Sequence, residues 1–173
     1  YSIVKALREM NKEILVIEFD PDIIEGLSSE GIPCMYGDIG DVEVLRRARL
    51  EDADIVISTI PRLEDNLLLI DLAKKINPKI LVIITASTID HAEELYSNGA
   101  DYVILPKWLA GEKAAEFIVL YMKNPHSIEQ SKREHLRQIE RIKQEEFTTK
   151  SQPQLIILID GIKKYLKRNY EED

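Results

Sequence analysis

The feature that most constrains the fold is a series of short apolar runs separated by longer segments with helical spacing. Residues 14–17, 54–58 and 80–84 form such runs, in which apolar residues follow one another rather than alternate with polar ones. A run of this kind indicates a strand buried on both faces, as in parallel sheets. Because strands and helices alternate with short loops, we predict an α/β fold with a Rossmann-like doubly wound parallel sheet and right-handed crossovers.

The expected elements follow one another along residues 2–122. Helices are expected at 2–10, 21–31, 42–48, 64–76, 91–97 and 107–122, and strands at 14–17, 32–36, 54–58, 80–84 and 102–105. Pro21 suits the first turn of a helix, and Asp20 precedes it as an N-cap residue. The order is therefore one helix first, and then strand and helix in turn.

The chain changes character after Asn124. We place a Rossmann-like nucleotide-binding domain at 1–124 and a C-terminal helical extension at 125–173. Residues 127–147 are rich in charge with a narrow apolar stripe, which is typical of a long surface or partner-packing helix. After a linker at 148–153, residues 155–166 favour a final helix, although 155–159 alone would fit a helix or a strand.

A doubly wound fold starts with a strand and a glycine-rich loop, and this sequence opens inside a helix. It begins with Tyr1 rather than methionine, so we expect a chain fragment from which the first strand and its loop are absent. That strand would be central in the sheet. The strand must therefore be disordered, lie outside this sequence, or be replaced by another segment.

Composition narrows the classes of partner. The net charge of −8 argues against a nucleic-acid partner, because neutralising phosphates requires a basic face. The single cysteine, Cys34, leaves no internal disulfide and no cysteine-rich zinc site, which agrees with a reducing cytosol. The longest apolar runs are too short to span a bilayer, so we predict no direct membrane insertion by this chain.

Acidic residues follow two of the predicted strands. Glu18 stands at the end of one strand, where a carboxylate can accept hydrogen bonds from the two ribose hydroxyls of an adenosine. Asp20 can share that task, although its role as a helix cap is the better supported one. Gly37 and Asp38 follow the next strand, where glycine permits a close backbone approach and aspartate can meet an adenine amino group or an adjacent backbone amide. The sequence therefore predicts an adenosine site at this edge of the sheet.

These motifs together resemble one family. The segments are 14–20 (ILVIEFD), 36–38 (YGD), 58–61 (STIP) with 65–66 (DN), and 99–106 (GADYVILP). In their order and spacing they resemble the regulatory nucleotide-binding domain of potassium transport, called TrkA-N, KTN or RCK-N, over roughly residues 1–123. The loop that contains Pro61 is most similar to the corresponding loop of the domains that follow cation/proton antiporters of the Kef type.

The resemblance implies a binding pocket, a class of ligand and a kind of partner. The cofactor-binding residues it implies are Glu18, Phe19, Asp20, Gly37, Asp38, Ile39, Thr59, Ile60, Pro61 and Asn66. The ligand it implies is NAD or NADH, or alternatively AMP, ADP or ATP. It also implies a homodimer or larger homo-oligomer in the cytoplasm, which gates a membrane-embedded cation channel or transporter. The helical extension at 125–173 would then serve dimerisation or contact with that transporter. Besides lacking the glycine loop, the chain has Thr85, Ala86 and Ser87 where family members often carry an arginine.

Three functions follow from these expectations. The leading one is a ligand-sensing regulatory module that is not an enzyme and that works by shifting a conformational equilibrium. The second is an assembly subunit that has lost nucleotide binding. The third is a fragment of an NAD-dependent oxidoreductase, which would need an acid or base beside the nicotinamide, usually from a further domain.

Overall fold

The computed structural model describes residues 2–124, 127–145 and 155–160. Its elements in chain order are α1 (Ser2–Glu9), β1 (Glu13–Glu18), α2 (Pro21–Ser29), β2 (Cys34–Tyr36), α3 (Val42–Arg47), β3 (Ile55–Ser58), α4 (Leu63–Ile76), β4 (Leu81–Thr85), α5 (Ile89–Ser97), β5 (Tyr102–Ile104), α6 (Pro106–Lys123), α7 (Ser127–Glu145) and β6 (Ile156–Asp160). The alternation predicted from the sequence is present throughout residues 2–123. The predicted linker at 148–153 lies outside the described residues.

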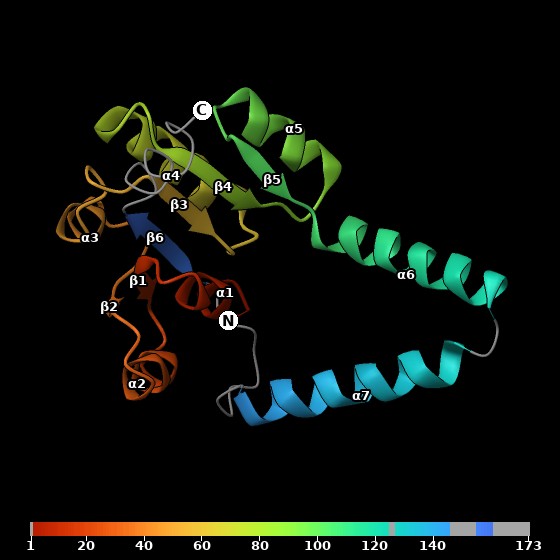
Figure 1. The fold of residues 1–173 in the computed structure, drawn as a ribbon. Helices are drawn as coiled ribbons and strands as arrows, with labels where there is room; N and C mark the ends of the chain where they lie inside the picture. The colour runs from red at the N-terminus through yellow and green to blue at the C-terminus, as the bar shows by residue number, and fades with distance from the viewer. Residues whose placement is uncertain (1, 125–126, 146–154, 161–173) are drawn as a thin grey trace, which may run out of the picture.

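The six strands form one sheet in the order β2-β1-β6-β3-β4-β5 (Figure 1). Strand β1 pairs in parallel with β2, and β3, β4 and β5 pair in parallel with one another. These five strands confirm the predicted Rossmann-like arrangement. The sheet as a whole is mixed, because β6 runs antiparallel to both of its neighbours.

Strand β6 corrects the prediction of a helix at 155–166. Residues 156–160 are extended, and they lie between β1 and β3, in the central position that was expected to lack a strand. Their pairs include Leu15 with Leu158 on one side and Val56 with Leu158 on the other. Another segment of the chain has therefore taken the central place in the sheet. The remainder of the predicted helix, 161–166, lies outside the described residues.

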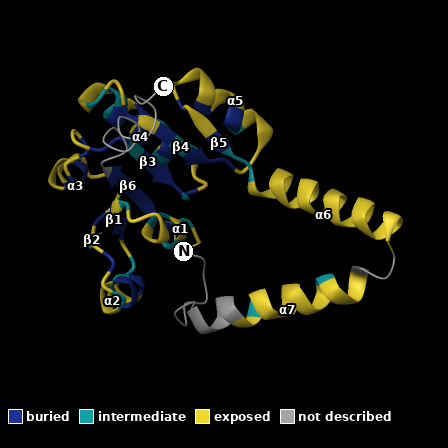
Figure 2. Cartoon of the chain, viewed as in Figure 1, coloured by how far each residue is buried: buried dark blue, intermediate teal, exposed yellow. Residues whose placement is uncertain are grey.

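The core has two halves, one on each face of the sheet (Figure 2). Ile156 and Leu158 of β6 pack into the half that contains buried residues of α3, α4 and α5. Leu155, Ile157 and Ile159 pack into the other half, with buried residues of α1 and α2. Because both faces of β6 are covered, its apolar residues run without interruption.

Short polar side chains mark the starts of several helices. Asp20 Oδ1 accepts from Asp22 N at 2.9 Å at the start of α2, and Asp41 Oδ1 accepts from Glu43 N at 2.9 Å at the start of α3. Thr88 Oγ1 accepts from His91 N at 3.2 Å at the start of α5. These caps satisfy N–H groups that have no partner within the helix. The predicted capping role of Asp20 is confirmed.

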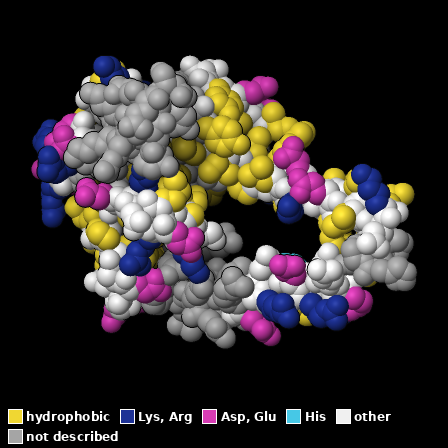
Figure 3. Space-filling model, in the orientation of Figure 1, with side chains coloured by type: hydrophobic (Ala, Val, Ile, Leu, Met, Phe, Trp, Pro, Cys, Tyr) yellow, Lys and Arg dark blue, Asp and Glu magenta, His cyan; other side chains and the backbone are white. Residues whose placement is uncertain are grey.

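Helices α6 and α7 form an arm that leaves the sheet after β5 (Figure 1). No residue of α6 is buried against the described part of the chain. Figure 3 shows apolar side chains gathered over β4 and β5, where Leu81 and Tyr102 are about half exposed. None of the described helices is both long and apolar enough to cross a membrane.

Candidate functional site

A pocket lies at the carboxyl ends of β1 and β2 and beside the loop that joins β3 to α4. Its volume is about 140 Å³, and it is lined by Ile17, Glu18, Phe19, Gly37, Asp38, Ile39, Ile60, Arg62, Asp65 and Ile156. In open parallel α/β sheets, ligands bind at this edge. Pockets that enclose a whole drug-sized ligand measure roughly 300–1,000 Å³. This pocket is therefore large enough for one part of such a ligand and not for the whole of it.

Glu18 is the buried acceptor of this pocket. Only 2% of the residue is exposed, and two backbone N–H groups hold its carboxylate in place. Oε1 accepts from Phe19 N at 2.8 Å and from Asp20 N at 3.1 Å, whereas Oε2 has no hydrogen-bond partner among the described residues. Burial raises the pKa of this carboxyl above its ordinary value, and the two backbone hydrogen bonds oppose that rise. Oε2 is thus an unsatisfied buried acceptor that a donor group of a ligand would satisfy.

Gly37 joins β2 to the pocket and cannot carry a side chain there. Its N–H donates to Glu18 O at 3.0 Å, which extends the pairing of β1 and β2 to the pocket edge. A Cβ atom at this position would lie 2.5 Å from Cγ1 of Val44 in α3. Because valine is stiff at χ1 and Val44 is buried, the clash has no cheap relief. Glycine is required here by the packing of α3.

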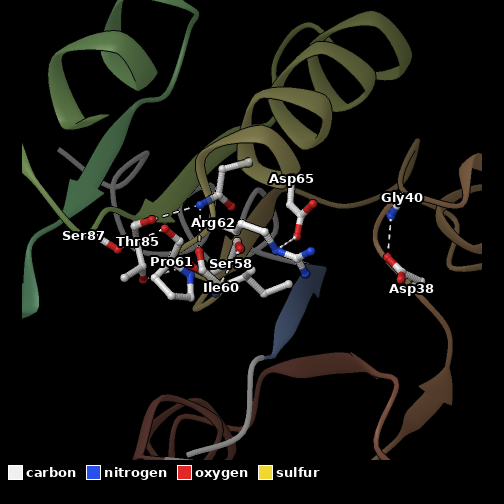
Figure 4. A network of polar contacts seen from close by, with 10 residues as sticks. Asp38, Gly40, Ser58, Ile60, Pro61, Arg62, Asp65, Thr85 and Ser87 are labelled. Atoms are coloured by element: carbon white, nitrogen blue, oxygen red, sulfur yellow. Dashed lines mark hydrogen bonds and ion pairs between the residues drawn. The ribbon is translucent and has the colours of Figure 1, made fainter. Parts of the chain in front are cut away.

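The turn after Gly37 carries Asp38 and Ile39. Asp38 Oδ1 accepts from Gly40 N at 2.8 Å, which fixes the turn (Figure 4). Ile39 is 3% exposed and belongs to the core, while Asp38 is exposed at the pocket wall. The turn therefore presents the Asp38 carboxylate to the pocket, and the buried Ile39 side chain anchors the turn in the core.

Asn66 ties the loop after β3 to the end of β4. Its Nδ2 donates to Ile60 O at 2.7 Å and to Thr85 O at 2.9 Å, and the residue is fully buried. Thr85 Oγ1 donates in turn to Ser58 O at 3.0 Å. Figure 4 shows Ser58, Ile60 and Thr85 close together beside the start of α4. The predicted binding residue Asn66 thus shapes the pocket from behind rather than lining it.

Thr59 and Pro61 are also engaged away from the pocket. Thr59 N donates to Leu155 O at 2.9 Å, and Leu155 N donates to Thr59 Oγ1 at 2.8 Å. Pro61 O accepts from Ser87 Oγ at 3.2 Å. Thr59 therefore anchors the residue that leads into β6, and Pro61 fixes the loop to the segment after β4.

The structure brings six of the ten predicted residues to the pocket. These are Glu18, Phe19, Gly37, Asp38, Ile39 and Ile60. Four others, Asp20, Thr59, Pro61 and Asn66, do not line it. Whether any of the ten binds a ligand remains a prediction.

Two polar residues of the pocket were missing from the predicted set, Arg62 and Asp65. Arg62 Nε lies 2.9 Å from Asp65 Oδ2, and the two side chains meet between the Ile60–Pro61 segment and the Asp38 turn (Figure 4). Their spacing of three residues at the start of a helix was the available signal, since such pairs are neighbours on a helix surface. Ile156 was also missed, because 155–166 was expected to be helical.

Metal binding has no support in the described part of the chain. Within residues 2–124, 127–145 and 155–160, no group of three or more His, Cys, Asp or Glu side chains is placed to hold a metal ion.

Comparison with known proteins supports the family resemblance. The family model of the TrkA-N domain matches residues 1–106. Potassium channel protein 1 of Methanocaldococcus jannaschii is 25% identical over 129 residues, which are 73% of this chain and 38% of the relative. The glutathione-regulated potassium-efflux protein KefC of Enterobacter sp. is 33% identical over 89 residues, 51% of this chain and 14% of the relative. The chain thus spans well under half the length of these relatives.

Solved structures share the fold at low sequence identity. The TrkA-N domain of the inner membrane protein ybaL from Escherichia coli superposes with a TM-score of 0.64 at 23% identity, covering 67% of this chain and 86% of that one. The GsuK channel bound to NAD superposes with a TM-score of 0.54 at 24% identity, covering 61% of this chain and 19% of that one. Both likenesses confirm the Rossmann-like architecture.

Proposed function

Because the chain belongs to the TrkA-N domain family, we propose that it is a regulatory nucleotide-binding module acting on a potassium channel, a potassium transporter or a cation/proton antiporter. Its control works through a ligand-dependent change of conformation. Its relatives include a potassium channel protein and KefC. The module acts in the cytoplasm, beside the membrane protein that it regulates.

One observation carries the proposal: the buried Glu18 carboxylate, whose Oε2 has no partner, at the wall of a pocket at the strand ends. An unsatisfied buried acceptor costs about 1–3 kcal/mol, so a ligand that supplies a donor gains that energy. Vicinal ribose hydroxyls supply two donors in one small group. The pocket volume of about 140 Å³ suits such a moiety.

The ligand is an adenine nucleotide, either NAD or NADH, or one of AMP, ADP and ATP. GsuK, which shares the fold, is bound to NAD in one structure and to ADP in another. In this chain, Asp38 lies at the pocket wall and can accept from the adenine amino group. Binding, rather than catalysis, is the role that we assign to the site.

The change of conformation takes place in a homodimer that forms through α6. Helix α6 exposes the large apolar side chains Trp108, Leu109, Phe117, Ile118, Val119, Leu120, Tyr121 and Met122. Six of these residues are consecutive, 117–122, and a large exposed apolar surface marks an interaction site. A nucleotide that binds one dimer arrangement more tightly than another shifts the balance between them by that difference in affinity.

Calorimetric titration of the chain with NADH, NAD, ATP, ADP and AMP tests the proposal. We expect at least one of them to bind, and we expect Glu18→Ala to weaken binding about tenfold or more in a chain that stays folded, with a lower thermal midpoint because Phe19 N and Asp20 N lose their acceptor. Asp22→Ala, on the exposed first turn of α2, is the matched control and should bind as the unaltered chain does. If none of the five nucleotides binds, the assembly-subunit alternative replaces the sensor. Turnover of NADH with a reducible substrate would instead favour the oxidoreductase alternative.

A further inference from the structure

Acidic side chains outnumber basic ones around the pocket, and the basic one is Arg62. Three carboxylates, those of Glu18, Asp38 and Asp65, line the pocket, and Arg62 is the one cationic side chain among its described lining residues. An acceptor-rich wall binds hydroxyl and amino groups, whereas a guanidinium binds anions. The pocket thus offers two different chemistries side by side.

Asp65 holds the Arg62 side chain in place and leaves most of its N–H donors available. Arg62 Nε lies 2.9 Å from Asp65 Oδ2, and no other interaction of the Arg62 side chain is present among the described residues. The guanidinium has five N–H donors, so the two terminal nitrogens keep four of them for a ligand. The Arg62 side chain is 65% exposed and that of Asp65 only 19%, so the more enclosed carboxylate orients the accessible guanidinium.

The start of α4 adds to the attraction for an anion. Arg62 is the N-cap residue of this 14-residue helix, and its side chain makes no capping hydrogen bond. The N–H groups of a first helical turn have no partner within the helix and carry the positive end of its dipole. Glu64 and Asp65 in that turn reduce this field, so the guanidinium is the principal anion-binding group.

The unpartnered Oε2 of Glu18 indicates independently that a ligand belongs here, because the residue is 2% exposed and lines the same pocket. A molecule that satisfies both groups has vicinal hydroxyls and a phosphate close to them. A nucleoside 5′-phosphate has both groups on one ribose.

We infer that Arg62 binds the phosphate of the nucleotide whose ribose lies on Glu18, and that it thereby selects nucleotides over uncharged nucleosides. This inference rests on the proposed nucleotide-binding function. Phosphate and guanidinium pair through two parallel hydrogen bonds, which lysine cannot reproduce with a single ammonium group. Asp65 acts as the positioning residue for Arg62.

The test compares AMP with adenosine on the intact chain, by calorimetry for AMP and by ligand-observed NMR for adenosine. Arg62→Ala should weaken AMP about tenfold to a hundredfold, the range for loss of a charge-assisted contact, and should change adenosine by no more than about twofold. Arg62→Lys should recover part of the AMP affinity. Raising the salt concentration should weaken AMP binding to the unaltered chain more than to Arg62→Ala.

Arg46→Ala is the matched control. Arg46 also pairs with a carboxylate three residues away, Glu43 at 2.8 Å, and its side chain is 70% exposed, but it does not line the pocket. Its replacement should leave both affinities unchanged. Because Arg62 is largely exposed, neither variant should alter the thermal midpoint by more than about 1–2 °C.

The outcomes separate this inference from the function on which it rests. Equal weakening of AMP and adenosine by Arg62→Ala would overturn phosphate binding by Arg62 and leave nucleotide binding standing. Unchanged AMP affinity would overturn it too. If the unaltered chain binds neither AMP nor adenosine nor the other nucleotides, the proposed function fails, and the inference fails with it.

Discussion

Helices α4 and α6 are both rich in apolar residues, but they have opposite surroundings. Helix α4 buries Asn66, Leu69, Ile70 and Ala73, and all but Asn66 belong to the hydrophobic core on one face of the sheet. Helix α6 buries no residue against the described part of the chain, although residues 117–122 are apolar without a break. An apolar helix gains stability only from what it packs against.

The difference separates the part of the chain that packs its own core from the part that we propose as the dimer contact. The α/β region around α4 contains a packed hydrophobic core, whereas α6 exposes apolar side chains that no described residue covers. A helical segment that is apolar on all sides, as residues 117–122 are, belongs in the interior of a larger assembly. The predictions below test this contrast, from the largest expected effect to the smallest.

Truncation of a leucine should have very different consequences in the two helices. Leu69→Ala should lower the free energy of unfolding by about 2–5 kcal/mol, because it leaves a cavity in a closed core. Leu120→Ala removes the same atoms from a residue that is 50% exposed and should cost less than about 1 kcal/mol in dilute solution. Urea unfolding at low protein concentration measures both. Equal costs would show that α6 is packed in the monomer.

The polar tie at the start of α4 should be the next largest effect. Asn66→Ala leaves the carbonyls of Ile60 and Thr85 without their donor, and each buried unsatisfied group costs about 1–3 kcal/mol. We expect a loss of about 2–4 kcal/mol by urea unfolding. Asn98→Ala is the control, since Asn98 is exposed and its side-chain amide donates, among the described residues, to Glu94 O alone. A loss no larger than that of the control would contradict the assigned role of Asn66.

Self-association should depend on α6 and be independent of the exposed side of α4. Leu120→Glu should weaken the dimer about tenfold to a hundredfold, because burial of a charge at an apolar contact is unfavourable. Leu68→Glu in α4 is the matched control, since Leu68 is 37% exposed and should leave association unaltered. Sedimentation velocity over a range of concentrations measures both. A dimer insensitive to Leu120→Glu would place the contact elsewhere.

The contrast also shows how much of the structure could be predicted. Strands β1, β3 and β4 follow from uninterrupted apolar runs, and Glu18 was located because strand ends collect at one edge of a parallel sheet. Strand β6 was missed for a physical reason. A short strand buried on both faces lacks alternation and cannot be told from a buried helix by periodicity.

The site was predictable only as far as local position determines it. The acceptors of Asn66 lie 6 and 19 residues away, so its role as a tie depends on tertiary contacts that no local pattern encodes. Thr59 is engaged by Leu155, 96 residues away, for the same reason. By contrast, the pairing of Arg62 with Asp65 could have been predicted from helical spacing alone.

The smallest predicted effect is a pH dependence of stability that arises in the α/β region. Burial raises the pKa of Glu18 in the folded state, opposed by the hydrogen bonds from Asp20 N and Phe19 N. The folded chain therefore binds this proton more tightly than the unfolded chain does. The free energy of unfolding should fall as the pH rises from the ordinary glutamic acid pKa through the raised one, and this part of the stability is fully present only below that window.

Glu18→Gln removes the titration and keeps an acceptor for both backbone donors. We expect a flatter dependence of stability on pH in the weakly acidic range, and a gain in stability near pH 7 relative to the unaltered chain. Glu129→Gln, exposed on α7, is the control and should follow the unaltered chain. Urea unfolding between about pH 4 and pH 8 measures the three curves, a range that brackets the ordinary glutamic acid pKa. Parallel curves for Glu18→Gln and the unaltered chain would mean that the buried carboxylate is satisfied in a way the structure does not show, and would weaken its assignment as the acceptor for ribose.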